Sequence, residues 1–231
     1  MNGIYEYMLQ GTAIDIEDEK NKLIILETTE KKFTITRFNN GLVLIKIKKN
    51  LIPLIEGYIR TYKSNLFSKE AISYMSEHFK LECPLDPWEY IYGIRLQKEL
   101  AIINDKKSAV KINLDELMDL NPNRFKKYPF KYPSDELIYF GTFEDREIVS
   151  LVSGYLGKYK AVELTGETLK EYRNNGYAKT NTFFITEYLL DKGYEVLTTN
   201  GGNNTASVKT VESLGFQKYG SRLAFFESAK R

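Results

Sequence analysis

The chain has 231 residues, 42% of them hydrophobic and 28% charged, and its 33 basic and 31 acidic residues leave a net charge of +2. This composition excludes a disordered chain and provides no strong field for nucleic acid or an anionic membrane surface. With one cysteine, Cys83, and one histidine, His78, neither an internal disulfide nor a zinc site of the usual ligands is expected. No apolar run approaches the roughly 20 residues that span a bilayer, so we expect a cytoplasmic protein without a membrane segment.

The first part of the chain is predicted to begin as β-structure. Residues 23–27 form one candidate strand, and residues 33–36 alternate apolar and polar side chains. A further apolar run, residues 42–47, follows the turn residues Asn40 and Gly41. Because both turn residues tolerate positive φ, this Asn-Gly pair between two β-rich runs predicts a hairpin.

A helix and then a break follow the hairpin. Ser68 is a candidate N-cap for this helix. Its apolar face has the spacing of a helix and consists of Ile72, Met75 and Phe79. Pro84 and Pro87 are expected to interrupt regular structure, and residues 88–100 fit either a helix or a strand. We place a domain boundary near residues 95–107.

This boundary divides the chain into an N-terminal α+β domain, residues 1–95, and a second domain, residues 96–231. The second domain alternates strands and helices, which predicts a mixed α/β sheet flanked by helices. Strands are predicted at residues 110–112, 137–143, 148–155, 160–165, 195–199 and 216–226, and helices at residues 114–120, 176–191 and 204–214. Gly193 is well placed to end the second of these helices, because glycine accepts the left-handed conformation found there.

The most informative segment joins the strand predicted at residues 160–165 to the helix predicted at residues 176–191. The first turn of such a helix has backbone N–H groups without an internal partner, and the helix dipole adds partial positive charge. A phosphate or pyrophosphate can bind at such a site. Gly176 has no side chain to block the anion, and Ala178 is small. By itself, this pattern with Arg173 also fits a plain strand–helix turn that carries a surface arginine.

A second motif lies further along the chain. Asn204, a good helix N-cap, and Ser207 begin the next predicted helix, Gly215 ends it, and Phe216 starts the strand that follows. Together the two motifs resemble the GNAT superfamily of acyl-CoA-dependent N-acyltransferases, whose pyrophosphate loop reads Arg/Gln-x-x-Gly-x-Gly/Ala. The later helix of that family carries an asparagine, a small residue three positions on, and then Gly-Phe. The resemblance covers residues 108–231 and implies a GNAT-like mixed sheet flanked by helices, preceded by a smaller α+β N-terminal domain.

The resemblance also implies acetyl-CoA as the cosubstrate. Its pantetheine arm would lie between the strands at residues 160–165 and 195–199 and pair with strand backbone around Leu164 and Thr165. A backbone N–H there would stabilise the oxyanion formed during acyl transfer. The residues expected to contact the cosubstrate are Leu164, Thr165, Arg173, Asn174, Asn175, Gly176, Tyr177, Ala178, Asn204 and Ser207.

In such a reaction the acceptor amine attacks directly and must be neutral, so a general base is useful. Glu163, on the strand beside the thioester, is the first candidate for this base and Glu167 the second, although a salt-bridged or solvent-facing role fits either carboxylate. Many family members place a tyrosine seven residues after the asparagine as the acid for the leaving thiolate. That position is Val211 here, which leaves Tyr219 or water as the candidate acid.

Residues 124–132 interleave cations with aromatic side chains: Arg124, Phe125, Lys126, Lys127, Tyr128, Phe130, Lys131 and Tyr132. Such a mixture can bind nucleic acid or an anionic acceptor. Because the total charge is near neutral, we favour a solvated loop that packs its aromatic residues inward. The loop precedes the strands in the region where the family's acceptor-lining loops lie.

We therefore expect an N-acetyltransferase that acts on the amine of a small molecule, without membrane or nucleic-acid partners and with a homodimer compatible with the sequence. Two alternatives remain open: a protein or peptide acetyltransferase, and a CoA-binding regulatory module without turnover, suggested by Val211. The N-terminal domain lacks a phosphate loop. It either covers one side of the acceptor cleft and helps to choose the amine, or is a stabilising or dimer-forming domain.

Overall fold

The computed structural model describes Ile4, Met8 and residues 21–29, 32–63, 65–79, 81–82, 88–95, 100–101, 108–120, 122–127, 129–157 and 159–227. Cys83 and the two prolines expected to break the chain, Pro84 and Pro87, lie outside these residues, as does Tyr128. Most of the expected boundary at residues 95–107 also lies outside them.

By its contacts the chain forms two compact units that are not consecutive segments. The larger, here called the C-terminal unit, consists of Met1–Ile14, Tyr92–Thr199 and Thr205–Lys218. The N-terminal unit consists of Asp15–Ile91, Asn200–Asn204 and Tyr219–Arg231. Whether residues 1–95 and 96–231 fold as separate domains stays a prediction.

The strands of the N-terminal unit are β1 (Leu23–Glu27), β2 (Lys32–Phe38), β3 (Val43–Ile47), β4 (Leu81–Glu82) and the later part of β11 (Gln217–Glu227). They lie in the order β1-β3-β2-β11. β1 runs parallel to β3, whereas β2 is antiparallel to both β3 and β11. The strands expected from the apolar runs before residue 50 are therefore confirmed.

The hairpin between β2 and β3 is also confirmed, but its turn is longer than an Asn-Gly pair. Phe38 N donates to Leu42 O at 2.9 Å and Gly41 N to Phe38 O at 3.0 Å, which closes a loop of three residues. Gly41 has a φ of +87°, whereas Asn40 keeps a negative φ and accepts a hydrogen bond from Leu42 N at 3.1 Å through its side chain. This is the pattern of a turn followed by one left-handed glycine.

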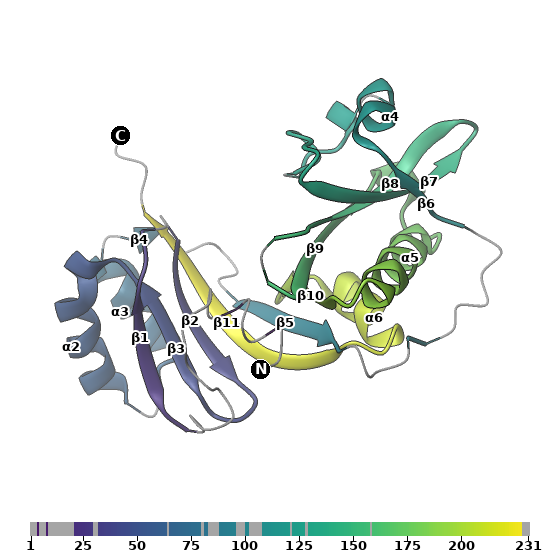
Figure 1. Ribbon diagram of the computed structural model, residues 1–231. Helices are drawn as coiled ribbons and strands as arrows, with labels where there is room; N and C mark the ends of the chain where they lie inside the picture. The colour runs from purple at the N-terminus through teal and green to yellow at the C-terminus, as the bar shows by residue number, and fades with distance from the viewer. Residues whose placement is uncertain are drawn as a thin grey trace. The chain divides into compact units, whose positions relative to one another are not determined.

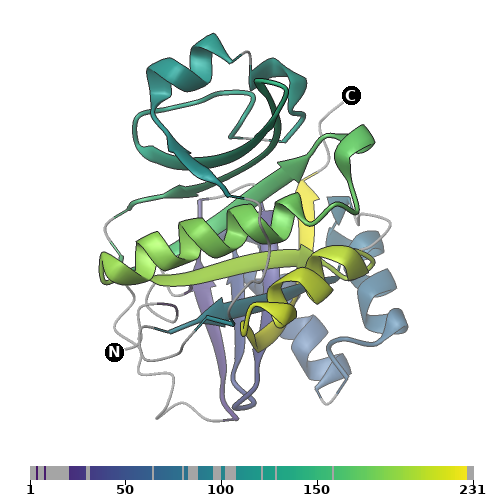
Figure 2. The same cartoon turned by 90° about the vertical axis from the view of Figure 1, so that its right-hand side faces the viewer.

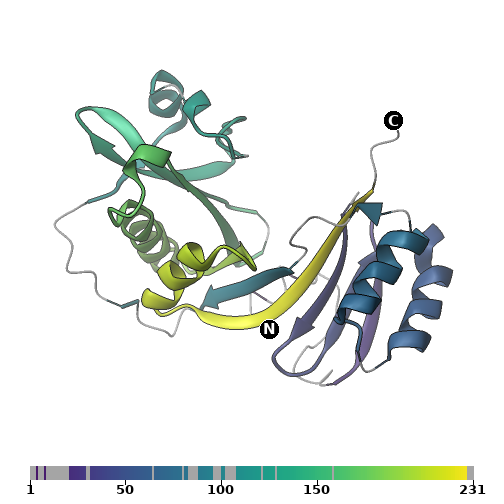
Figure 3. The same cartoon turned by 180° about the vertical axis from the view of Figure 1, so that it is seen from behind.

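Two helices, α2 (Ile52–Tyr62) and α3 (Lys69–Phe79), pack on one face of the N-terminal sheet (Figures 1 and 3). As predicted, Ser68 caps α3, because its hydroxyl accepts a hydrogen bond from Ala71 N at 3.2 Å. The short 3-10 turn before α2 covers Lys49–Leu51. The core of this layer consists of Phe33, Ile35, Ile45, Ile47, Ile55, Tyr58, Leu66, Ala71, Met75, Phe79, Leu223 and Phe225.

The C-terminal unit is built on strands in the order β10-β9-β8-β7-β6. Their bounds are Glu195–Gly201 for β10, Ala161–Thr168 for β9, Glu147–Tyr155 for β8, Leu137–Glu144 for β7 and Val110–Ile112 for β6. All neighbours are antiparallel except β9 and β10, which are parallel. Each strand was predicted. The ambiguous residues 88–100 contain a strand, β5 (Trp88–Ile94).

Helices cover both faces of this sheet. α5 (Tyr177–Asp191) packs across β7, β8 and β9, and α6 (Thr205–Ser213) lies beside it (Figure 2). The opposite face is covered by α4 (Leu114–Asp119) and by the segment after it, which includes a 3-10 turn at Pro122–Arg124. The core on this face consists of Ile112, Leu117, Phe125, Phe130, Tyr139, Ile148, Leu151 and Leu169.

Glycine ends both long helices of the unit. Gly193 has a φ of +78°, with Gly193 N donating to Leu190 O and Tyr194 N to Leu189 O, both at 2.9 Å. The same two-bond motif ends α6 at Gly215, whose φ is +91°. Because a side chain is strained in this conformation, both positions favour glycine, as predicted for Gly193.

The protein is thus a mixed α/β protein with helices flanking a mixed sheet, which confirms the predicted fold class. Among the described residues, no helix combines the length and apolar character that crossing a membrane requires. No cluster of three or more histidine, cysteine, aspartate or glutamate side chains in the described part of the chain could hold a metal ion.

Candidate functional site

The parallel strands β9 and β10 stop pairing before either strand ends. Their register runs from Ala161 opposite Glu195 to Leu164 opposite Thr198. β9 continues to Thr168 and stays paired with β8 throughout. Beyond Leu164 the side of β9 that faced β10 has no strand partner among the described residues. An extended ligand with amide groups can pair with strand backbone of this kind.

Alternation along β9 puts Glu163, Thr165 and Glu167 on one face of the strand. Glu163 is half-buried, and its Oε1 accepts a hydrogen bond of 2.6 Å from the hydroxyl of Thr199 on β10. The carboxylate is thereby held over the point where the two strands separate. Leu164, buried at 6% exposure, points to the face that α5 covers, so its backbone is the part left for a ligand.

Glu167, the second candidate for a general base, already has partners. Its Oε2 accepts hydrogen bonds from the backbone N–H groups of Lys126, at 2.8 Å, and Lys127, at 2.9 Å. The Nζ of Lys127 donates to Gly166 O at 2.8 Å. The segment that follows α4 is therefore attached to the end of β9, on the face that carries Glu163.

The start of α5 has the geometry of an anion site. Gly176, the N-cap, has a left-handed backbone with a φ of +82°, and no side chain caps the helix. The first turn contains no acidic residue. Tyr177 and Ala178 are the first two residues of the helix, so no helical turn precedes them to supply carbonyl partners. Ala178 and the preceding loop residues Arg173, Asn174 and Asn175 are exposed.

This loop is held by its own side chains. Asn174 is left-handed, with a φ of +65°, and the amide of Asn175 donates to the carbonyls of Tyr172 and Arg173 at 3.3 Å. Arg173 Nε donates to Thr168 O at 3.2 Å, which ties the loop to the end of β9. The side chain of Tyr177 turns inward, is buried, and donates a hydrogen bond to Glu144.

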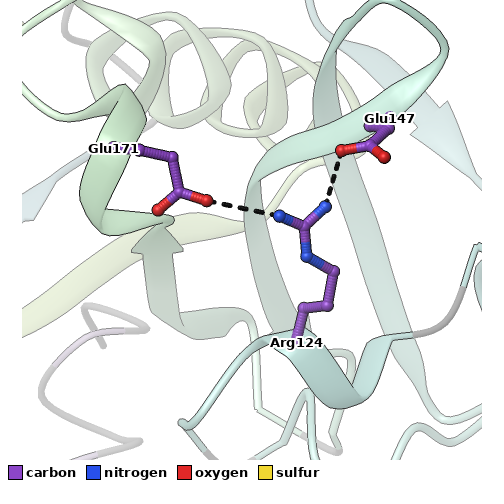
Figure 4. Close-up of polar contacts among 3 residues, drawn as sticks. All are labelled: Arg124, Glu147 and Glu171. Carbon is purple, nitrogen blue, oxygen red and sulfur yellow. Dashed lines mark hydrogen bonds and ion pairs between the residues drawn. The ribbon is translucent and has the colours of Figure 1, made fainter.

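An arginine from the segment after α4 reaches the same region (Figure 4). The guanidinium of Arg124 lies 2.8 Å from Glu147 on β8 and 3.3 Å from Glu171, in the 3-10 turn Lys170–Tyr172 that precedes the loop. All three side chains are exposed, so each ion pair contributes little stability by itself. Arg124 is nevertheless paired with both carboxylates.

The rest of this segment packs as favoured from the sequence. Phe125 and Phe130 are 1% and 0% exposed and meet edge to face, with ring centroids 5.7 Å apart. The ammonium groups of Lys126, Lys127 and Lys131 belong to exposed residues, and Tyr132 is 60% exposed. Phe125 and Phe130 therefore belong to the core, whereas Tyr132 and the cations lie at the surface.

The second motif lies at the start of α6. Ser207 is half-buried in its first turn, and Val211 is buried at 4% exposure. Val211 therefore belongs to the core. Asn204 immediately precedes α6 and is exposed, but it belongs by its contacts to the N-terminal unit, as does Tyr219. Tyr219 is buried at 9% exposure on β11, so its assignment as an acid stays a prediction.

Sequence reasoning missed the supporting contacts of three side chains. Thr199, Glu144 and Arg124 each hold one of the predicted residues or loops through a side-chain contact. Thr199 could have been found from the register, because it lies two positions beyond Leu197, the residue opposite Glu163. No local sequence pattern predicts the contacts of Glu144 and Arg124.

Comparison with known proteins gives one family. The model of the FR47-like protein family matches residues 139–224, which include β9, the loop before α5, and α6. No curated protein matches the chain. Because the match spans both motifs found in the sequence, it supports the resemblance drawn from them.

Several solved structures share the fold at low sequence identity. An acetyltransferase of the GNAT family from Colwellia psychrerythraea is 14% identical, with a TM-score of 0.51 over 84% of this chain and 80% of its own. A GCN5-related N-acetyltransferase from Kribbella flavida is 11% identical, with a TM-score of 0.50 over 70% and 65%. A functionally unknown conserved protein from Staphylococcus epidermidis, 11% identical with a TM-score of 0.50, covers 92% of this chain and 97% of its own.

Proposed function

We propose that the C-terminal unit is a GNAT-type acyltransferase domain and that this protein transfers an acetyl group from acetyl-CoA to the amine of a small molecule; the family match over residues 139–224 and the shared fold support this. The observation that carries the proposal is the start of α5, where a left-handed glycine replaces a side-chain cap and the first turn lacks acidic residues. A helix start of this kind favours a phosphate group. Its loop is also tied to β9, the strand that carries Glu163.

The residues present fit the pyrophosphate of acetyl-CoA. The N–H groups of Tyr177 and Ala178 would donate to it, and Gly176 leaves room for its approach. Exposed Arg173 supplies a positive charge, and Asn174 and Asn175 shape the loop. On α6, Ser207, together with Asn204 just before it, would contact the remainder of the cosubstrate.

The pantetheine arm would extend along β9 past the point where β10 leaves it. Its amides would pair with backbone groups near Leu164 and Thr165. The thioester would then lie beside these residues, and a backbone N–H there would stabilise the negative charge that develops on the thioester oxygen.

The acceptor amine would approach on the face of Glu163. Its nitrogen attacks the thioester carbon, so a carbon–nitrogen bond forms and the carbon–sulfur bond breaks. Glu163, oriented by the hydroxyl of Thr199, takes the proton that the nitrogen loses, directly or through water. The departing thiolate gains a proton from water.

Calorimetric titration with acetyl-CoA and transfer assays against a panel of small amines and peptides test the proposal. We expect binding, and acetylation of small amines in preference to peptides. Preferred acetylation of peptides would assign a protein acetyltransferase instead. Binding without transfer to any acceptor would leave the regulatory alternative, and absence of binding would refute the cosubstrate.

Replacing the proposed base gives a second test. Glu163→Gln keeps a similar shape and can still accept the hydrogen bond from Thr199, but it cannot take a proton. Turnover should fall by about 10²–10⁴, with acetyl-CoA affinity near that of the wild type. Full activity of this variant across the pH range would remove Glu163 from the mechanism.

A further inference from the structure

We infer that Asn181, buried beneath α5, is a positioning residue for the pyrophosphate of acetyl-CoA. Its side-chain amide fixes the start of α5, and the loop before it, on the sheet. The inference rests on the proposed function, because it takes this helix start as the pyrophosphate site. Asn181 does not touch the cosubstrate itself, since the residue is only 1% exposed.

The amide of Asn181 lies at the centre of a buried polar cluster. Its Oδ1 accepts a hydrogen bond from the hydroxyl of Thr142 on β7, and its Nδ2 donates to Ser150 Oγ on β8 at 2.9 Å. Thr142 and Ser150 stand opposite each other on the two strands, and both are buried. Hydrogen bonds depend on direction and are stronger away from water. One side chain of α5 is thus held by two neighbouring strands.

The first residue of α5 is attached to the same strand as Asn181. Tyr177 donates to Glu144, which lies two residues beyond Thr142 on β7. Tyr177 and Asn181 are about one helical turn apart, roughly 6 Å along α5, and Thr142 and Glu144 are roughly 7 Å apart along β7. Because these spacings match, the two bonds together fix both the rotation of the helix start and its position along the strand.

The same cluster reaches the beginning of the loop that precedes α5. Ser150 Oγ lies 2.8 Å from Thr168 Oγ1, on the last residue of β9. The carbonyl of Thr168 accepts the bond from Arg173 Nε at 3.2 Å. The loop from Arg173 to Tyr177 is therefore attached at both ends to strands that the Asn181 cluster connects. A displacement of Asn181 moves the groups that the pyrophosphate would meet.

The later part of α5 is held by a different kind of contact. Ile185 and Leu189 are buried there, and apolar burial stabilises a helix without fixing a direction. Thr186 is also buried on α5, but its hydroxyl has no hydrogen-bond partner among the described residues. Thr186 is therefore a buried threonine outside the cluster, and Ile185 is a buried apolar residue one turn beyond Asn181.

The first test is calorimetric titration with acetyl-CoA. Thr142→Val keeps the shape of the side chain but removes one bond to Asn181, and the affinity should fall about threefold. In Asn181→Leu, which removes both bonds, it should fall about tenfold. Thr186→Val is the matched control and should bind like the wild type, because the same substitution there breaks no bond. Unchanged affinity in Thr142→Val would refute the inference, whether or not Asn181→Leu folds.

A double variant tests whether Thr142 acts through Asn181. Once Asn181→Leu has removed the acceptor of the bond, adding Thr142→Val should weaken acetyl-CoA binding no further. Losses that simply add would mean that the two residues act independently. That result would overturn the cluster as a unit.

A loss of stability has to be distinguished from a loss of position. Ile185→Val removes a buried methylene group and should lower the midpoint of urea unfolding, yet its acetyl-CoA affinity should equal that of the wild type. In steady-state kinetics, Asn181→Leu and Thr142→Val should raise the KM for acetyl-CoA in step with the calorimetric loss, with kcat and the KM for the amine within about twofold. Weakened binding in Ile185→Val, or a fall in kcat alone in Thr142→Val, would reject the positioning role.

Amide hydrogen exchange tests the attachment without any ligand. Thr180 N donates to Gly176 O at 3.0 Å, across the first turn of α5. Exchange at the Thr180 amide, measured by NMR, should be at least about threefold faster in Thr142→Val than in the wild type and unchanged in Thr186→Val. Equal exchange in Thr142→Val would refute the attachment.

The outcomes also separate this inference from the proposed function. A wild-type protein that binds no acetyl-CoA would refute the proposed function, and with it the role of Asn181 in positioning the pyrophosphate. A wild type that binds acetyl-CoA, with equal affinity in Thr142→Val, would refute the inference alone.

Discussion

The starts of α4 and α5 differ in how the backbone N–H groups of the first helical turn are treated. At α4, Asn113 accepts a hydrogen bond from Glu116 N at 2.8 Å, and Glu116 accepts one from Asn113 N at 3.0 Å, so side chains of the helix satisfy its own first turn. Asp115 and Glu116 add negative charge there. α5 starts at Gly176 with neither a side-chain cap nor an acidic residue in its first turn.

The difference follows from what each helix needs. α4 has 6 residues, too few to be stable without a cap, and one of them, Leu117, is buried. α5 has 15 residues and buries Ile185 and Leu189 against the sheet, so it holds its shape without a cap. A start without a side-chain cap is thus tolerated in α5, and it leaves room there for an anion from outside the chain.

The largest loss of acetyl-CoA affinity is expected when the glycine at the start of α5 is replaced. Gly176→Val places a β-branched side chain at a φ of +82° and in the path of the anion. Acetyl-CoA affinity should fall at least tenfold, or about 1.4 kcal/mol, by calorimetry. Gly57→Val in α2 is the control, because a Cβ there meets no atom within 4 Å. Unchanged affinity in Gly176→Val would reject the loop as the pyrophosphate site.

A milder change makes the start of α5 resemble that of α4. Lys179 occupies the third position of α5, which corresponds to Glu116 in α4. Lys179→Glu should therefore weaken acetyl-CoA binding by about three- to tenfold, more at low salt than at high salt, because the charge opposes the anion. Lys179→Gln removes the positive charge without adding a negative one. Its acetyl-CoA affinity should therefore lie between that of the wild type and that of Lys179→Glu. An affinity independent of charge at this position would mean that the phosphates bind elsewhere.

The smallest effect is expected at α4. Asn113→Ala removes the cap and should lower the free energy of unfolding by about 1 kcal/mol, measured with urea. Its acetyl-CoA affinity should equal that of the wild type. A loss of affinity there would show that the two helix starts are not independent.

Most of the elements could be predicted because their signals are local. Apolar, β-rich runs predicted the strands, with alternation at residues 33–36, and Gly193 marked the end of α5, where the structure has a left-handed backbone. The helix α2 was missed, although Pro53 in its first turn and the buried pair Ile55 and Tyr58 carry helical signals. Gly57 in its middle weakens the pattern, because glycine disfavours a helix interior.

The candidate site was predictable only in part. The motifs identified Gly176 and the strand that carries Glu163. They did not identify the side chains that contact Glu163 and the loop before α5. The bond from Thr199 to Glu163 depends on the register of two parallel strands, and the contact of Glu167 with Lys126 depends on how a distant loop folds back. Such contacts join residues far apart in sequence, and neither residue type demands that partner.

The pairing of β11 with β2 also bears on the order in which the protein is synthesised. Gly220–Phe226 pair with Phe38–Lys32, yet they leave the ribosome about 180 residues later, a delay of roughly 10–40 s at about 5–20 residues per second. During that time β2 lacks its neighbour and remains an open sheet edge, the kind of surface on which chains aggregate. The nascent chain is therefore most in need of a chaperone between the emergence of β2 and that of its last strand.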